Sequence, residues 1–152
     1  MNFFKYAGAF VLPCLLASAQ SANAPKAEAL VKQAVAFAKQ NGAEKLLQET
    51  NNGTGKFHVA AGSDLYIFIY DEQGVVKAIG YNTGALVGKN RIDMKDPDGK
   101  MVIRDLIGIA KTKGKGWYDY KYPDPTDNKV KGKSSYVELY EGLIIGAGIY
   151  KD

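Results

Sequence analysis

The residues of this 152-residue chain best suited to chemistry are tyrosines, which recur at alternate positions in segments that read as β-strands. Because successive side chains of a strand point to opposite faces, Tyr66, Phe68 and Tyr70 share one face of a predicted strand. A tyrosine presents an apolar ring and a hydroxyl, so such rows on one side of a sheet would line a pocket for a small polar ligand. Alternatively, these hydroxyls face water. The other rows are Tyr118, Tyr120 and Tyr122, opposite Trp117, and Tyr136 with Tyr140.

Three cationic side chains are candidates for holding a carboxylate ligand. Arginine binds a carboxylate through two parallel hydrogen bonds, and the chain has only Arg91 and Arg104. Arg91 lies in a predicted irregular connector. Arg104 lies on a predicted helix, away from its apolar stripe, so that a solvated salt bridge with a neighbouring acid is the alternative to ligand binding. Lys133, before the last tyrosine row, is the third candidate. The predicted ligand-binding set is Tyr66, Phe68, Tyr70, Arg91, Arg104, Trp117, Tyr118, Tyr120, Lys133 and Tyr136.

The remaining composition argues against catalysis and against a bound cofactor or metal. One Cys and one His exclude a disulfide scaffold within the chain and any site built from several such ligands. His58 has no acid or nucleophile beside it, and the segment 96–99 lacks the downstream acid of a calcium loop. The glycines do not have the spacing of a phosphate-binding loop. A net charge of +4 does not indicate a nucleic-acid partner, and none is expected.

The start of the chain has the features of a secretory signal peptide. Lys5 precedes an apolar run over 6–16, and small residues follow. That run is shorter than the roughly 20 residues that span a bilayer. We predict cleavage after Ala19, so that residues 1–19 are the signal peptide, residues 20–25 form a short mature tail, and the protein is periplasmic or secreted. The alternatives are cleavage after Ala24, a lipoprotein at Cys14, and an uncleaved anchor.

The elements that must position these residues follow from changes in the hydrophobic period. A tight turn joins the first two predicted strands, and an irregular connector over 80–97 follows them. Asp98 is predicted to cap a helix that stops at Gly114. Helices packed on five strands that are joined largely by hairpins make an antiparallel α+β domain. The predicted helices cover 25–41, 43–48 and 99–113, and the predicted strands cover 65–70, 75–79, 116–122, 134–140 and 143–150.

Five short motifs follow one another in the second half of the chain. They are Gly88-Lys89-Asn90, Lys95-Asp96-Pro97-Asp98-Gly99-Lys100, Gly114-Lys115-Gly116-Trp117-Tyr118-Asp119-Tyr120, Lys133-Ser134-Ser135-Tyr136-Val137 and Gly146-Ala147-Gly148-Ile149-Tyr150. In this order and spacing they resemble the single Cache domain family, type 2, over about residues 26–152. Members of that family are extracytoplasmic sensor modules, many of them in bacterial chemoreceptors and some as stand-alone exported proteins.

The resemblance implies a PAS-like fold, in which a long N-terminal helix packs on a five-stranded antiparallel sheet with a further helix in the connector. It also implies a pocket for small metabolites, often short-chain carboxylates. Two positions depart from the family pattern. Family members often have a His before the connector glycine, where this chain has Ala78-Ile79-Gly80, and a Pro where Thr83 stands. If that His contacts the ligand in other members, the ligand set differs here.

We therefore expect a ligand-binding sensor domain without catalysis. Its ligand would be a small metabolite such as a short-chain carboxylate, and binding would shift the balance between two conformations. No output segment follows the last predicted strand, so the signal would pass through a membrane receptor or another signalling protein. One alternative is an exported interaction module or accessory subunit that kept the fold without the pocket. A small exported hydrolase is disfavoured because no nucleophile–base pair or paired carboxylates emerge.

Overall fold

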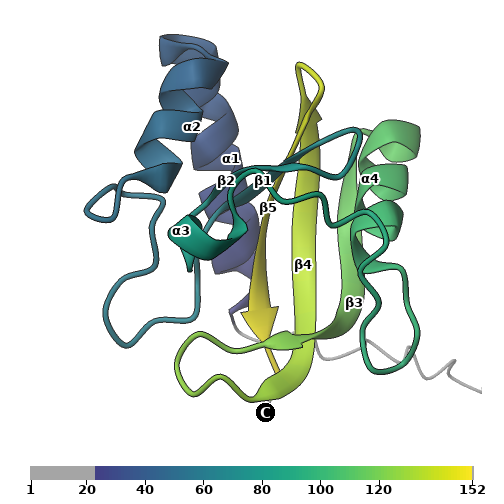
Figure 1. Cartoon of the computed structure of the whole chain (residues 1–152). Helices are drawn as coiled ribbons and strands as arrows, with labels where there is room; N and C mark the ends of the chain where they lie inside the picture. The colour runs from purple at the N-terminus through teal and green to yellow at the C-terminus, as the bar shows by residue number, and fades with distance from the viewer. Residues whose placement is uncertain (1–22, 152) are drawn as a thin grey trace, which may run out of the picture.

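The computed structural model describes residues 23–151, which form one antiparallel sheet with helices on both faces (Figure 1). The sheet has five strands in the order β2-β1-β5-β4-β3. This arrangement confirms the predicted α+β class and the five-stranded antiparallel sheet. The predicted signal peptide lies outside the described residues. The strands are β1 (Phe68–Asp71), β2 (Val76–Ile79), β3 (Lys115–Pro123), β4 (Val130–Tyr140) and β5 (Leu143–Tyr150).

The long first helix, α1 (Ala24–Asn41), covers one face of the sheet through a stripe of small apolar residues. It packs on β5 and β4, and its small side chains let the helix lie close to the strands. Gly42, at φ 92°, ends α1 and begins α2 (Ala43–Asn51), which runs three residues further than predicted. Among the described residues, no helix is long and apolar enough to cross a membrane. The buried stripe of α1 is Ala24, Ala27, Val31, Ala34, Val35 and Ala38.

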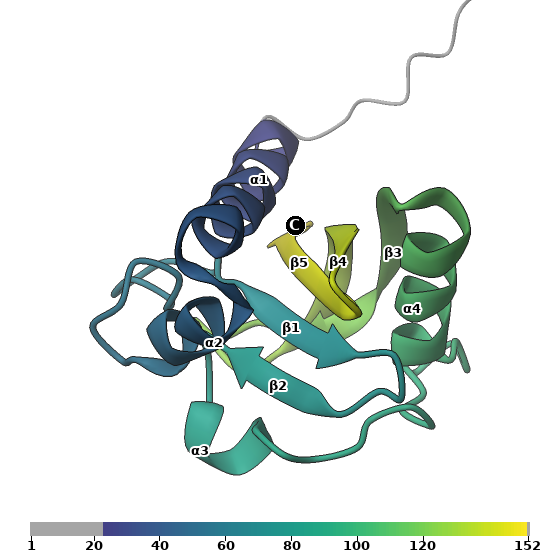
Figure 2. The same ribbon diagram turned by 90° about the horizontal axis from the view of Figure 1, so that it is seen from above.

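The opposite face of the sheet is covered by α4 (Val102–Lys113), which packs against β3 and β4. Figure 2 shows α1 and α4 on either side of the central strands. Gly114, at φ 78°, ends α4 as predicted. The predicted start at Gly99 with Asp98 as cap is wrong. The carboxylate of Asp96 accepts the backbone N–H groups of Asp98 and Lys100, and this holds residues 96–100 in a turn outside the helix.

Two strands begin three or more residues away from the predicted position. β1 begins at Phe68 instead of Leu65, because the Ile67 N–H donates to the Phe57 carbonyl in the preceding loop instead of to a strand. β4 begins at Val130, four residues before the predicted Ser134, because its pairing with β3 continues to the end of that strand. The connector contains one further short helix, α3 (Thr83–Leu86).

The alternation of side chains divides the interior into two cores. Ile67 and Ile69 point toward α1, whereas the aromatic side chains between and beside them point toward α4. In the same way, Trp117 of β3 packs on the α1 side, and Tyr118, Tyr120 and Tyr122 pack on the α4 side. Two of the predicted tyrosine rows therefore share one face of the sheet, as a common pocket requires.

Candidate functional site

A small cavity lies between the sheet and α4, and we call it the inner pocket. Its volume is about 10 Å³, which is room for a single water molecule. β1 and the residues just before it supply one wall, β3 and β4 supply another, and the first turns of α4 cover them. The lining residues are Tyr66, Phe68, Tyr70, Ile79, Val102, Ile103, Leu106, Tyr120, Tyr122 and Lys133.

Within the part of the chain that the structure describes, Lys133 is the one charged side chain that lines the inner pocket. It is only 1% exposed, and its Nζ donates to the Tyr66 hydroxyl over 2.9 Å. Four aromatic rings surround the ammonium group, with their centroids at 4.4–5.5 Å from Nζ, a range in which cation–π attraction operates. The four rings belong to Tyr66, Phe68, Tyr122 and Tyr150.

No carboxylate pairs with Lys133 among residues 23–151, where seven ion pairs occur and all involve other side chains. Burial lowers the pKa of Lys133 to about 7, although the more distant Asp64 and Asp124 oppose this shift. A buried amine without a counter-ion is costly, because removing a charge from water carries a large penalty. Lys133 is therefore a buried amine that, among residues 23–151, is held by one phenol and four aromatic rings and by no carboxylate.

Two glycines of β5 make room for the side chains of the pocket. A Cβ atom on Gly148 would lie 2.6 Å from the Cε atom of Lys133, and one on Gly146 would lie 2.3 Å from the ring of Phe68. Both distances are far below van der Waals contact. Both glycines lie inside a regular strand pairing, so their role there is close packing. Their contribution to the site was missed.

The tyrosine hydroxyls form a short polar chain behind Lys133. The Tyr66 and Tyr150 hydroxyls share a hydrogen bond of 3.4 Å, and the Tyr150 hydroxyl donates to the Pro123 carbonyl over 2.6 Å. The hydroxyls of Tyr120 and Ser135 are 2.9 Å apart. Burial raises the pKa of Tyr66, Tyr70 and Tyr120, so these phenols are neutral hydrogen-bond donors at physiological pH.

A larger hollow, which we call the outer cleft, lies between the connector and the end of the β3–β4 hairpin. Its volume is about 520 Å³. Tyr122 lines both the outer cleft and the inner pocket, and it is half-buried. Arg91 lies in the cleft near Tyr122 and partly opposes the rise that burial causes in the pKa of that phenol. The Tyr81 hydroxyl donates to the Asn128 side chain over 2.9 Å and ties the connector to the hairpin.

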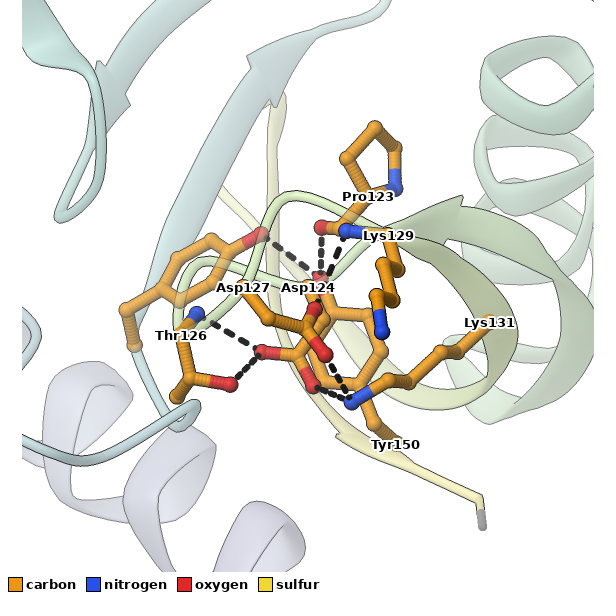
Figure 3. A network of polar contacts seen from close by, with 8 residues as sticks. Pro123, Asp124, Thr126, Asp127, Lys129, Lys131 and Tyr150 are labelled. Carbon is orange, nitrogen blue, oxygen red and sulfur yellow. Dashed lines mark hydrogen bonds and ion pairs between the residues drawn. The ribbon is translucent and has the colours of Figure 1, made fainter.

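A polar network fixes the β3–β4 loop beside the cleft, and Figure 3 shows Asp124 at its centre. One oxygen of the Asp124 carboxylate accepts hydrogen bonds from the backbone and side chain of Thr126, and the other accepts one from Lys131 at 2.8 Å. Although burial opposes them, these bonds lower the pKa of Asp124. Lys131 also pairs with Asp127 at 3.0 Å. The loop that follows Pro123, whose carbonyl accepts from Tyr150, is thus held by side chains of the β3–β4 hairpin itself.

Four of the ten predicted site residues line neither the inner pocket nor the outer cleft and make other contacts. Trp117 and Tyr136 face α1, with ring centroids 5.4 Å apart, because both occupy the opposite alternation of their strands. Arg104 makes an exposed ion pair of 2.8 Å with Asp93, which is the alternative that its position suggested. Tyr118 shares the pocket face but donates to Asp105 of α4.

The other six predicted residues line the inner pocket or the outer cleft. Tyr122 and Tyr150 complete the cage around Lys133 and were not in the predicted set, although Tyr122 belonged to one of the tyrosine rows. No cluster of three potential metal ligands occurs within residues 23–151. The five residues in the inner pocket are Tyr66, Phe68, Tyr70, Tyr120 and Lys133, and Arg91 lines the outer cleft.

Solved structures with the same fold are sensory domains. A methyl-accepting chemotaxis protein from Vibrio parahaemolyticus superposes with a TM-score of 0.71 at 28% identity, over 84% of this chain and 88% of that one. A Cache chemosensory domain studied for carboxylic acid recognition superposes with a TM-score of 0.70 at 25% identity, over 86% of this chain and 95% of that one. These likenesses confirm the predicted PAS-like fold.

Sequence comparison gives the same family. The sensor histidine kinase MctS of Rhizobium johnstonii is 34% identical over 93 residues, which are 60% of this chain and 20% of that protein. The methyl-accepting chemotaxis protein McpP of Pseudomonas putida is 34% identical over 61 residues, which are 39% of this chain and 11% of that protein. The match thus covers a small part of each relative. The model of Single Cache domain 2 matches residues 26–152, and the chain belongs to this family.

Proposed function

We propose that this domain is an extracytoplasmic sensor that binds a short-chain carboxylate beside Lys133 in the inner pocket. The observation that carries the proposal is the buried ammonium group, which is 1% exposed and has no carboxylate partner among the described residues. A ligand carboxylate would supply the missing counter-ion, and the surrounding phenols would donate to its second oxygen. The apolar side chains of α4 would contact a short alkyl chain.

The relatives support a sensory role. One similar domain recognises carboxylic acids, and two relatives are a chemotaxis receptor and a sensor kinase. By this likeness the domain binds and releases its ligand unchanged, without catalysis, and passes the signal to a membrane receptor or other signalling protein. The signal peptide predicted over 1–19 would export the chain, and the binding domain would cover 26–152 after the tail at 20–25.

Ligand binding requires the inner pocket to open, because its present volume of about 10 Å³ holds one water. The side chain of Tyr122 would move to open the pocket, since it is half-buried and lines both the inner pocket and the outer cleft. A ligand would reach the pocket from that cleft, where Arg91 attracts anions. Binding would then select an open conformation over the closed one.

The same small volume favours one other function, an exported interaction module or accessory subunit that kept the fold and lost the pocket. The two functions differ in their response to ligand. A closed pocket that never opens would give no stabilisation by any small carboxylate, and the domain would instead be recovered with a protein partner.

The test is a thermal-unfolding screen of short-chain carboxylates, with the corresponding amides as uncharged controls. At a hundredfold excess over Kd, a ligand stabilises the native state by about 2.7 kcal/mol, which is roughly 10 °C for a domain of this size. We expect saturable stabilisation by a carboxylate, none by its amide, and loss of the effect in Lys133→Met. Lys77→Met, at an exposed lysine of β2, is the matched control and should respond like the unaltered chain. Stabilisation that survives in Lys133→Met would contradict the proposed site.

A further inference from the structure

We propose, on the basis of the proposed function, that Lys133 gives up its proton in the empty pocket near neutral pH and takes one up when a carboxylate binds. Binding would then consume a proton, and the domain would respond to its ligand and to the acidity of its surroundings together. The groups that face the Lys133 amine from each element packed around it determine which form of the amine the empty pocket favours.

Among residues 23–151, the strands place only neutral groups against this amine. β3 contributes Tyr120 and Tyr122, and β5 contributes Tyr150. Phe68, the first residue of β1, and Tyr66, two residues before it, also place their rings against the amine. The amine uses one of its donors on the Tyr66 hydroxyl, at 2.9 Å, and the phenols around it are neutral because burial raises their pKa.

The helix on the other side supplies no counter-ion either. The α4 residues that line the pocket are all apolar. The charged side chains at the start of this helix have other partners, Arg104 with Asp93 at 2.8 Å and Asp105 with the Tyr118 hydroxyl. The three apolar residues are Val102, Ile103 and Leu106.

Loop residues complete the surroundings of Lys133. Asp64 and Asp124 are the acids whose charges act on it, but neither lies within the 4.0 Å of an ion pair. Asp124 is moreover paired with Lys131 at 2.8 Å. Arg91, across Tyr122, carries the same charge as the ammonium group and gives it no support. The protonated amine is therefore held by one phenol and by aromatic rings alone, which explains why burial lowers its pKa to about 7.

A bound carboxylate would reverse this balance, because a nearby negative charge favours the protonated amine. Only the protonated amine pairs with the anion, so affinity falls as pH rises past the pKa of the empty site. With that pKa at about 7, the protonated fraction, and hence the affinity, falls about tenfold between pH 6 and pH 8. A simple carboxylic acid stays ionised across this range, so its own titration contributes nothing.

The test is calorimetric titration of the chain with propionate at pH 8, in phosphate and in Tris, two buffers with different heats of ionisation. We expect the two binding enthalpies to differ by nearly the heat of one buffer proton, and the affinity to fall about tenfold from pH 6 to pH 8. Equal enthalpies in both buffers with constant affinity would overturn this inference and leave the proposed function standing. Absence of binding by propionate and by the other carboxylates of the screen would overturn both.

Two further measurements separate proton uptake from other effects of pH. Arginine stays protonated in proteins, so Lys133→Arg should bind propionate with the same affinity at pH 6 and pH 8, whereas Lys77→Arg should keep the tenfold change. Should Lys133→Arg not fold, carbon NMR of labelled lysines in the unaltered chain decides the matter. The Lys133 signal should titrate near pH 7 without propionate and well above pH 8 with it. A midpoint near 10 in the empty protein would overturn the inference.

Discussion

Gly148 has no side chain, and the space that a Cβ atom would fill holds the alkyl chain of Lys133. The ideal Cβ position is 2.6 Å from Lys133 Cε and 2.2 Å from Ser135 Oγ, so neither the lysine nor the serine could stay in place. The burial of the ammonium group therefore depends on a residue two strand positions from the end of β5. Without this glycine, the aromatic cage would lose the cation that it surrounds.

Gly148→Ala should therefore destabilise the domain and weaken its response to carboxylates. Overpacking a well-packed interior typically costs about 1–3 kcal/mol in the free energy of unfolding. Gly108→Ala is the matched control, because Gly108 is an exposed helix position where a Cβ atom meets nothing within 4 Å. Alanine there should stabilise by roughly 0.5–1 kcal/mol. Urea unfolding measures both, and equal effects of the two substitutions would contradict the packing argument.

At the scale of the elements, the turn before α4 depends on one carboxylate that reaches two segments. The side chain of Asp96 accepts the backbone N–H groups of Asp98 and Lys100 through one oxygen, and that of Lys121 in β3 through the other. Although burial opposes it, these bonds lower the pKa of Asp96. The turn therefore joins the connector to the strand that carries the pocket tyrosines. Asp98 makes only an exposed ion pair with Lys121.

Asp96→Ala should cost about 1–3 kcal/mol of stability, since three backbone donors lose their acceptor. Asp98→Ala should change the free energy of unfolding by less than about 0.5 kcal/mol, as expected for an exposed ion pair. Thermal unfolding of the two variants compares them directly. A loss of about 1 kcal/mol in Asp98→Ala would instead indicate the helix cap that the sequence pattern predicted.

The elements that were predicted well are those whose pattern is local. The period-two alternation of β1 and β3 assigned the tyrosines of each strand to one face. The apolar stripe of α1 predicted a helix from residue 25, one residue after its observed start at Ala24. The turn at Asp96 was missed because its third hydrogen bond comes from Lys121, 25 residues away. Likewise, the cage around Lys133 depends on pairings of β4 with both β3 and β5, which no single stretch of sequence contains.

At the scale of the whole molecule, the sheet separates two aromatic interiors. Trp117 and Tyr136 pack with α1, and the cage around Lys133 packs with α4. Predicting which row faces which helix requires the fold, because alternation assigns two faces to a strand but not the helix that covers each. The residues predicted for one pocket were therefore divided between two sides.

The stability of the whole domain should rise with pH above neutrality. The pKa of Lys133 is 10.5 as a free side chain and about 7 in the fold, so the unfolded state binds more protons between these values. Unfolding free energy then increases with pH in this window, by at most about 1.4 kcal/mol per pH unit, and gains nothing from this group below pH 7. Urea unfolding between pH 7 and pH 9 measures the slope. Lys133→Met should reduce it, and an unchanged slope in that variant would assign the effect to other groups.

The division of the aromatics by the sheet gives the molecule two optical probes of its own. Trp117 is the only tryptophan, and it lies on the α1 side, whereas the rings around Lys133 are tyrosines and one phenylalanine. Tyrosine absorbance in the near ultraviolet therefore includes events in the inner pocket, and tryptophan emission follows the other layer. An unlabelled sample thus distinguishes a change confined to the pocket from one that crosses the sheet to α1.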